Sequence, residues 1–171
     1  MKRYYKPIRQ IWHKPTQQQQ AWLLDRGSLT ERLQQAGTHF EVRLVEQGWR
    51  NSNRYPNWFA QMLQNKRSQF RSFKRYWFRE VQLWLNDQCM VTAISYTPAP
   101  TMQQQAKFLT KLSNRSLGSI LFSNRRIQRG DIVLRHHVST DCWSRASIFY
   151  LQGQPMLVSE YFHPCTYELS L

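Results

Sequence analysis

The stretch WFREVQLWL, residues 77–85, decides the fold and raises a question about function. Side chains two residues apart lie on the same face of a β-strand, so the pattern predicts an apolar row of Trp77, Val81 and Leu83. Arg79 lies in that same row. Because an unpaired charge among apolar side chains is strongly destabilising, either this face is open to water or an anion meets the guanidinium inside.

A second charged residue breaks the pattern of another predicted strand. In PMLVSEYF, residues 155–162, Glu160 shares its face with Val158 and Phe162. Two interpretations stay open: Arg79 and Glu160 form a buried salt bridge, or they are the two polar ends of a pocket. Such a pocket would bind an anionic ring, with a carboxylate on the arginine and a hydroxyl on the glutamate.

A third charge in an apolar row is Arg145, which is in phase with Trp143 and Phe149. We expect it to be structural or to lie at the rim of the pocket. The adjacent His136 and His137 would point to opposite faces of a strand, so a shared metal is not expected and no metal site is predicted. The sequence contains no GxSxG, Walker or HExxH motif, which disfavours hydrolase and nucleotide-binding functions.

The composition is that of one globular domain, since 171 residues that are 41% hydrophobic can build a core. Apolar runs are far shorter than the roughly 20 residues of a membrane-spanning helix, and the basic start lacks the apolar stretch of a secretory signal. Three cysteines without a CxxC spacing argue against a disulfide framework. We therefore expect a cytoplasmic monomer with reduced thiols.

The formal net charge of +14 indicates either an anionic partner or basic side chains that are solvated by water and counterions. Residues 47–79 contain eight Lys or Arg side chains and no acid, interleaved with aromatic residues. That pattern would suit a single-stranded nucleic-acid platform or a weak contact with an anionic membrane surface. Charge runs occur more often on solvated faces, so we predict that the segment 48–72 is peripheral to the chemistry and expect no nucleic-acid partner.

The remaining patterns predict an α+β fold with one antiparallel sheet, because strands divided by turns alternate with short helical pairs. A basic N-terminal arm is expected over residues 1–16, and a single domain over 17–171 in which the helical pairs cover a buried ligand pocket. About six strands are expected, at residues 39–47, 76–85, 89–97, 131–138, 143–151 and 155–162. Helices are expected at residues 17–26, 28–37, 103–112 and 116–122.

Four stretches of the chain have a distinctive order and spacing: WLLDRGSLTERLQQAG, RYWFREVQLWLNDQ, LSNRSLGSILF and WSRASIFYLQGQPMLVSEYFHP. In these stretches the chain resembles the bacterial chorismate-pyruvate lyases, the chorismate lyase family of ubiquinone biosynthesis. The resemblance keeps order and approximate spacing from about residue 20 to 165, and it is weakest in residues 48–72. It is absent in the N-terminal arm.

By this resemblance, the ligand contacts of the family fall on four positions of this chain. The arginine of the YWxRE motif lies at Arg79 and the glutamate of the last strand at Glu160. The resemblance therefore implies that these two charged residues in apolar rows are catalytic. The other two contacts fall at Leu29, where the family often has methionine, and at Leu117. If Leu29 acts through its backbone N–H the change matters little, whereas a side-chain contact would alter ring packing.

The resemblance implies that chorismate loses its enolpyruvyl group to give 4-hydroxybenzoate and pyruvate, without a cofactor. It leaves open whether the C4 proton passes directly to the enolpyruvyl group or to a protein base. Two alternatives are kept: a non-catalytic sensing domain for aromatic acids with the same fold, and a basic nucleic-acid-binding module. A sensor of this kind would need an upstream DNA-binding domain, for which the 16 residues before the first helix are too few.

Overall fold

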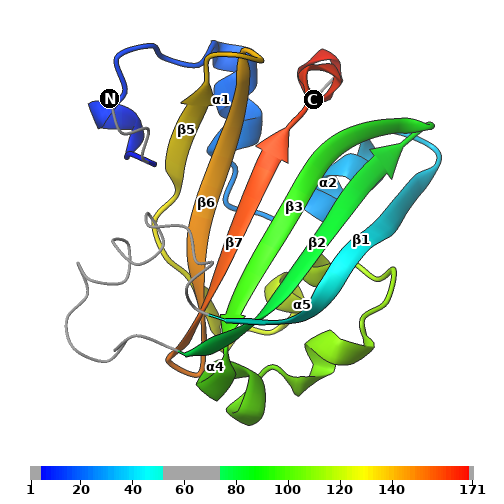
Figure 1. Cartoon of the computed structure of the whole chain (residues 1–171). Helices are drawn as coiled ribbons and strands as arrows, with labels where there is room; N and C mark the ends of the chain where they lie inside the picture. Colours follow the sequence, from blue (N-terminus) through cyan, green and yellow to red (C-terminus); the bar gives the residue numbers. More distant parts are fainter. Residues whose placement is uncertain (1–4, 52–73, 170–171) are drawn as a thin grey trace.

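The computed structural model describes residues 5–51 and 74–169, which form one open antiparallel sheet with short helices packed against it (Figure 1). The described strands follow the order β1-β2-β3-β7-β6-β4, and β5 pairs with β6 outside this path. The predicted α+β class is therefore confirmed. The strands are β1 (Phe40–Asn51), β2 (Arg75–Leu85), β3 (Gln88–Pro98), β4 (Ile127–Arg129), β5 (Val133–His137), β6 (Cys142–Leu151) and β7 (Gln154–Phe162).

Two tight hairpin turns set the register of the central strands. Asn86 and Asp87 join β2 to β3 with φ angles of 47° and 63°, and Gln152 and Gly153 join β6 to β7 with 50° and 83°. Positive φ at both turn residues matches the right-handed twist of the flanking strands. The Asn86 side chain also accepts hydrogen bonds from the backbone N–H groups of Thr38 and His39, which fixes the start of β1 beside the hairpin.

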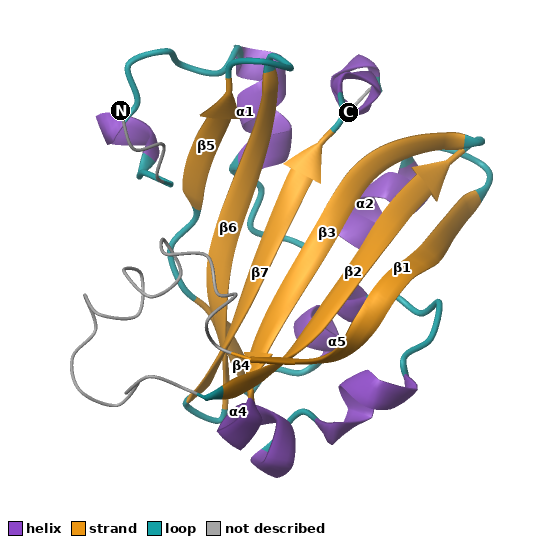
Figure 2. Cartoon of the chain, in the orientation of Figure 1, coloured by secondary structure: helices purple, strands orange, loops and turns teal. Residues whose placement is uncertain are grey.

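The helices are short and begin at clear caps. The Thr16 hydroxyl accepts a bond from the backbone of Gln19, whose side chain caps Thr16 in return, and Ser28 accepts from the backbone of Glu31. Figure 2 shows α1, α2 and α5 behind the sheet. The described helices are α1 (Gln17–Leu23), α2 (Leu29–Gln35), α4 (Ala99–Gln104) and α5 (Leu117–Ser123), with 3-10 turns η1 (Ile8–Gln10), η3 (Lys107–Lys111) and η4 (Pro164–Glu168).

Two predicted elements differ clearly from the structure, and one strand was not predicted. The strand expected at 39–47 continues to Asn51 after a register shift between Leu44 and Glu46. The helix expected at 103–112 is divided between α4 and η3, and α4 begins directly after Pro98. The described residues form seven strands, one more than expected. The additional strand, β4, was not predicted because its three residues are too few to show a period of two.

Two buried apolar clusters cover the same side of the sheet. The first packs α1 and α2, through Trp22 and Leu33, against the β2–β3 hairpin at Leu85. The second packs α4, η3 and α5 against β6 and β7, with Met156 among its fully buried residues. Each cluster removes large aliphatic side chains from water, which provides the main stabilisation of such a fold.

The N-terminal segment packs on the edge of the sheet from residue 5 onward. Lys6 exchanges two backbone hydrogen bonds with Leu134 of β5, at 2.9 and 2.8 Å. The Tyr5 hydroxyl lies 2.8 Å from the hydroxyls of both Ser144 and Ser159. Most of the basic segment 48–72 lies outside the described residues. Among the described helices, none is long and apolar enough to cross a membrane.

Candidate active site

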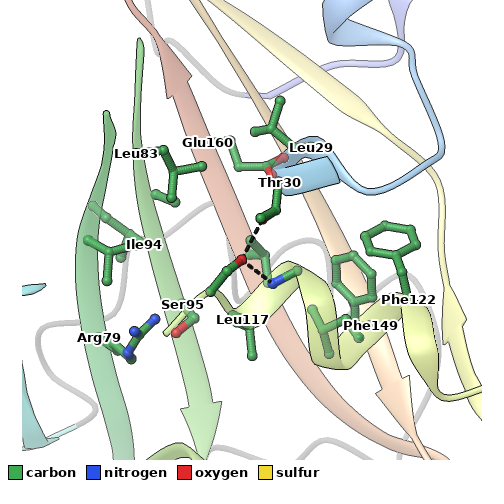
Figure 3. Close-up of a pocket in the computed structure, with 16 residues that line it drawn as sticks. Leu29, Thr30, Arg79, Leu83, Ile94, Ser95, Leu117, Phe122, Phe149 and Glu160 are labelled. Carbon is green, nitrogen blue, oxygen red and sulfur yellow. Dashed lines mark hydrogen bonds between the residues drawn. The ribbon is translucent and has the colours of Figure 1, made fainter. Parts of the chain in front are cut away.

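A pocket lies where the two apolar clusters meet, between the sheet and the starts of α2 and α5 (Figure 3). Its walls are mainly aliphatic and aromatic, with a few polar groups among them. All four residues named from the sequence line it. The lining residues are Leu29, Thr30, Arg79, Val81, Leu83, Ala93, Ile94, Ser95, Ser116, Leu117, Gly118, Leu121, Phe122, Phe149, Val158 and Glu160.

Arg79 forms one polar end of this pocket. Its side chain comes from β2 and is only 2% exposed. One terminal nitrogen donates hydrogen bonds to the backbone carbonyls of Ser113 and Arg115, at 2.9 and 2.8 Å, while Nε has no hydrogen-bond partner among the described residues. Burial lowers the pKa of Arg79 to about 10, so the group is still charged at neutral pH. The described part of the chain offers this charge no carboxylate partner.

Glu160 forms the other polar end, and it is paired with arginines from neighbouring strands. Arg145 of β6 donates from Nε to a carboxylate oxygen at 2.5 Å, and Arg129 of β4 lies 3.8 Å from the same oxygen. Burial alone would raise the pKa of the Glu160 carboxyl, but the charges of both arginines and the hydrogen bond from Arg145 lower it below its ordinary value. The carboxylate is therefore ionised at neutral pH and can accept a further hydrogen bond.

The salt bridge considered between Arg79 and Glu160 is not present; Glu160 pairs with Arg145 instead. Arg145 is 1% exposed and also donates to the backbone carbonyls of Trp22 and Asp25, at 3.0 and 2.8 Å. It therefore joins α1 to the sheet, which fits the structural role expected for it. In the other interpretation, Arg79 and Glu160 are separate polar ends of one pocket. The arrangement in Figure 3 agrees with this, because both residues line the pocket.

Leu29 and Leu117 enter the pocket at the first residues of α2 and α5. The hydroxyls of Thr30 and Ser116 form a short hydrogen bond to each other, and Ser116 also accepts from the backbone N–H of Gly118 at 3.1 Å (Figure 3). A Cβ at Gly118 would lie 2.8 Å from the Thr30 hydroxyl oxygen, so only glycine allows this close approach. The two helix starts are thus held together over the pocket.

Ser95 is a polar lining residue that the sequence reasoning missed. It lies on β3 directly opposite Arg79 in the strand register. Its hydroxyl is buried and has no hydrogen-bond partner within residues 5–51 and 74–169. The alternation Val91, Ala93, Ser95 places it in an apolar row, so the criterion that found Arg79 could have found it, had it been applied to hydroxyls as well as charges.

The family model and the curated relatives agree on one family. The family model for chorismate lyase matches residues 6–169. A "Probable chorismate pyruvate-lyase" of Methylococcus capsulatus is 34% identical over 160 residues, covering 85% of this chain and 94% of the relative. The chorismate pyruvate-lyase of Pectobacterium atrosepticum is 31% identical over 147 residues, covering 84% and 75%.

A solved structure with the same fold comes from a different class of protein. The effector domain of PhnF from Mycobacterium smegmatis superposes with a TM-score of 0.51 at 12% sequence identity, and the match covers 81% of this chain and 90% of that domain. At this level of identity the likeness concerns the fold alone.

Proposed function

Because the chain belongs to the chorismate lyase family, we propose that it converts chorismate to 4-hydroxybenzoate and pyruvate in the pocket between Arg79 and Glu160. The observation that carries the proposal is Arg79, a buried cation without an acidic partner among the described residues, whose Nε is unpaired. A charge in this setting costs stability until an anion meets it. A ligand carboxylate would neutralise the charge and complete the hydrogen bonding of the guanidinium.

The rest of the pocket suits the ring of the same ligand. Leu29, Leu83 and Phe149 offer apolar surface between the two polar ends. At the far end, Arg145 binds one oxygen of Glu160, and the second oxygen is the acceptor we assign to the 4-hydroxyl of chorismate. The substrate is thereby oriented along the line from arginine to glutamate, which places its reacting carbons between apolar walls.

The lowered pKa of Glu160 favours one route for the C4 proton of chorismate. In the reaction, the C3–O bond breaks, the C4 proton leaves, and the enolpyruvyl group gains a proton to become pyruvate. A carboxylate whose pKa is lowered by two arginines is a weak base, because efficient general bases have pKa values near the working pH. We therefore assign Glu160 to orienting the 4-hydroxyl, and we assign the C4 proton to direct transfer onto the enolpyruvyl methylene carbon.

The overall charge would assist binding. Chorismate is a dianion, and the chain carries a formal net charge of +14, so long-range attraction should speed encounter and weaken as salt rises. The product 4-hydroxybenzoate would supply the head group of ubiquinone. Cytoplasmic location and a monomeric state stay predictions from the sequence.

Incubation with chorismate tests the proposal directly. Ultraviolet absorbance would follow 4-hydroxybenzoate, and lactate dehydrogenase with NADH would report pyruvate in equal amount. Equal formation of both products by the wild type, and its loss in Arg79→Ala, is the expected result. Wild-type protein that binds 4-hydroxybenzoate but leaves chorismate intact would instead support the sensing function.

A further inference from the structure

Three metal-ligating side chains converge outside the pocket, where the N-terminal segment meets the β5–β6 turn. They are His13, His136 and Asp141, and their ligand atoms all lie within 4.8 Å of one another. His136 Nε2 is 2.8 Å from a carboxylate oxygen of Asp141. None of the three lines the pocket of Arg79 and Glu160, so the cluster is separate from the proposed lyase chemistry.

Each of the three is placed by a different piece of backbone. His136 lies on β5 and is half-buried, whereas His13 and Asp141 are exposed. Asp141 belongs to the turn between β5 and β6 and has a φ of 49°, a conformation that aspartate tolerates better than most residues. His13 comes from the segment between η1 and α1, which Figure 1 shows beside β5.

A buried tryptophan forms the floor of the cluster. The ring of Trp143 is 1% exposed, and its centroid lies 4.6 Å from that of His136 and 6.2 Å from that of His13. The two imidazole rings also contact each other, at 4.8 Å between centroids. Aromatic packing therefore keeps both imidazoles over one point of the sheet, and the carboxylate approaches them from the turn.

We propose that His13, His136 and Asp141 bind a divalent transition-metal ion, with Zn²⁺ as the probe and water as a fourth ligand. Two imidazole nitrogens and a carboxylate oxygen are a common donor set for zinc, and three protein ligands leave one position open. Zinc bonds of about 2.0–2.1 Å place tetrahedral ligand atoms roughly 3.3 Å apart. His13 and Asp141 are exposed side chains, so they can close from the present separations onto an ion held by His136.

The ion would tie the N-terminal segment to the sheet. Lys6 pairs with Leu134 earlier in the same segment, and His13 would add a second attachment point through the metal. Binding to the folded state alone raises stability with ligand concentration, so zinc should protect this segment before any other part of the chain. Turnover of chorismate should not change, because the ligands lie outside the pocket.

Titration calorimetry with Zn²⁺ on untagged, metal-free protein tests the site. We expect one ion per chain in the wild type and at least about tenfold weaker binding in His13→Ala and Asp141→Asn. His39→Ala is the matched control, since His39 is an exposed histidine outside the cluster and its loss should leave the affinity unchanged. Both ligand variants change exposed side chains, so they should fold.

Amide hydrogen exchange gives a second and independent result. Zinc should slow exchange at Lys6 and Leu134 in the wild type and in His39→Ala, but not in His13→Ala. A wild type that binds no zinc, or a His13→Ala protein that binds it equally well, would overturn the proposal. The cluster would then be a histidine–carboxylate pair with a second imidazole stacked on it.

Discussion

Arg145 binds the carboxylate of Glu160 through Nε at 2.5 Å, and this pairing leaves Arg79 as a buried cation of the pocket that has no acidic partner among the described residues. Both arginines are at most 2% exposed, and they lie in equivalent apolar rows of the sequence. Their hydrogen-bond partners distinguish them. Arg145 donates to a buried carboxylate and two carbonyls, whereas within residues 5–51 and 74–169 Arg79 donates to two carbonyls only. We therefore expect substitution of Arg145 to affect stability first and substitution of Arg79 to affect turnover first.

The Arg79→Ala variant should fold and lose most chorismate turnover. A hydrogen bond to a charged group is worth about 1.5–3 kcal/mol, so kcat/KM should fall by about 10- to 150-fold, and further in a dry site. Steady-state assays of pyruvate release measure the change. Circular dichroism and the melting temperature of the same preparation are the controls, and near-wild-type activity in a folded variant would refute the assignment of Arg79.

The Arg145→Met variant should be destabilised far more than Arg79→Met. Removing one partner of a buried ion pair typically costs about 3–5 kcal/mol, because the remaining charge is left uncompensated. Here Glu160 would keep only Arg129, at 3.8 Å. Urea unfolding measures the loss. The double variant Arg145→Met/Glu160→Gln should recover part of the lost stability. Equal stability of Arg145→Met and Arg79→Met would contradict the structural role of Arg145.

Glu160 should make the folded protein sensitive to acid. Its pKa in the folded state lies below the ordinary value of 4.5, so its contribution to stability is fully present above that value and is lost as pH falls through the lower, folded-state pKa. Unfolding free energies across the acid range should therefore fall more steeply in the wild type than in Glu160→Gln. Parallel curves for the two proteins would show that the carboxyl titrates alike in the folded and unfolded states.

Ser95→Ala should weaken ligand binding without unfolding the protein. The hydroxyl is buried beside Arg79 and unpaired among the described residues, so a ligand carboxylate that reaches Arg79 is its natural partner. One neutral hydrogen bond contributes about 0.5–1.5 kcal/mol, which corresponds to roughly a 2- to 12-fold loss of affinity for 4-hydroxybenzoate. Because this hydroxyl has no hydrogen-bond partner in the part of the chain that the structure describes, its removal leaves no group unpaired there, and the variant should melt at the same or a higher temperature. Unchanged affinity would place Ser95 outside the ligand contacts.

Strand periodicity singled out Arg79 and Glu160 because each is a charged residue in an otherwise apolar row, and both line the pocket in the structure. Their roles in ligand binding stay predictions. Arg79, Arg145 and Glu160 were all found in this way, but their pairing was not, since the pattern gives the face of a residue and not its neighbour across the sheet. Arg129 was missed for the same reason that β4 was missed: three residues carry no period. Pro98 is both the last residue of β3 and the N-cap from which α4 begins, so the helix starts earlier than the expected residue 103.

Thermal shifts with 4-hydroxybenzoate and benzoate test whether Arg79 and Glu160 are the two ends of one ligand site. Binding to the folded state alone adds about 2.7 kcal/mol of stability at one hundred times the dissociation constant. Both ligands carry the carboxylate for Arg79, but only 4-hydroxybenzoate carries a hydroxyl for the Glu160 oxygen that Arg145 does not bind. We therefore expect a concentration-dependent rise in melting temperature with both, and a clearly larger rise with 4-hydroxybenzoate.

Glu160→Gln is the matched variant for this comparison, because the amide keeps the shape of the side chain and an oxygen for Arg145. The oxygen that accepts the ligand hydroxyl becomes an NH₂ group, which cannot accept a hydrogen bond from it. The difference between the two ligands should therefore narrow in this variant, while Arg79→Ala should reduce the shift for both. Equal melting-temperature shifts with the two ligands in the wild type would still be consistent with carboxylate binding at Arg79. They would contradict the proposed hydrogen bond from the ligand hydroxyl to Glu160.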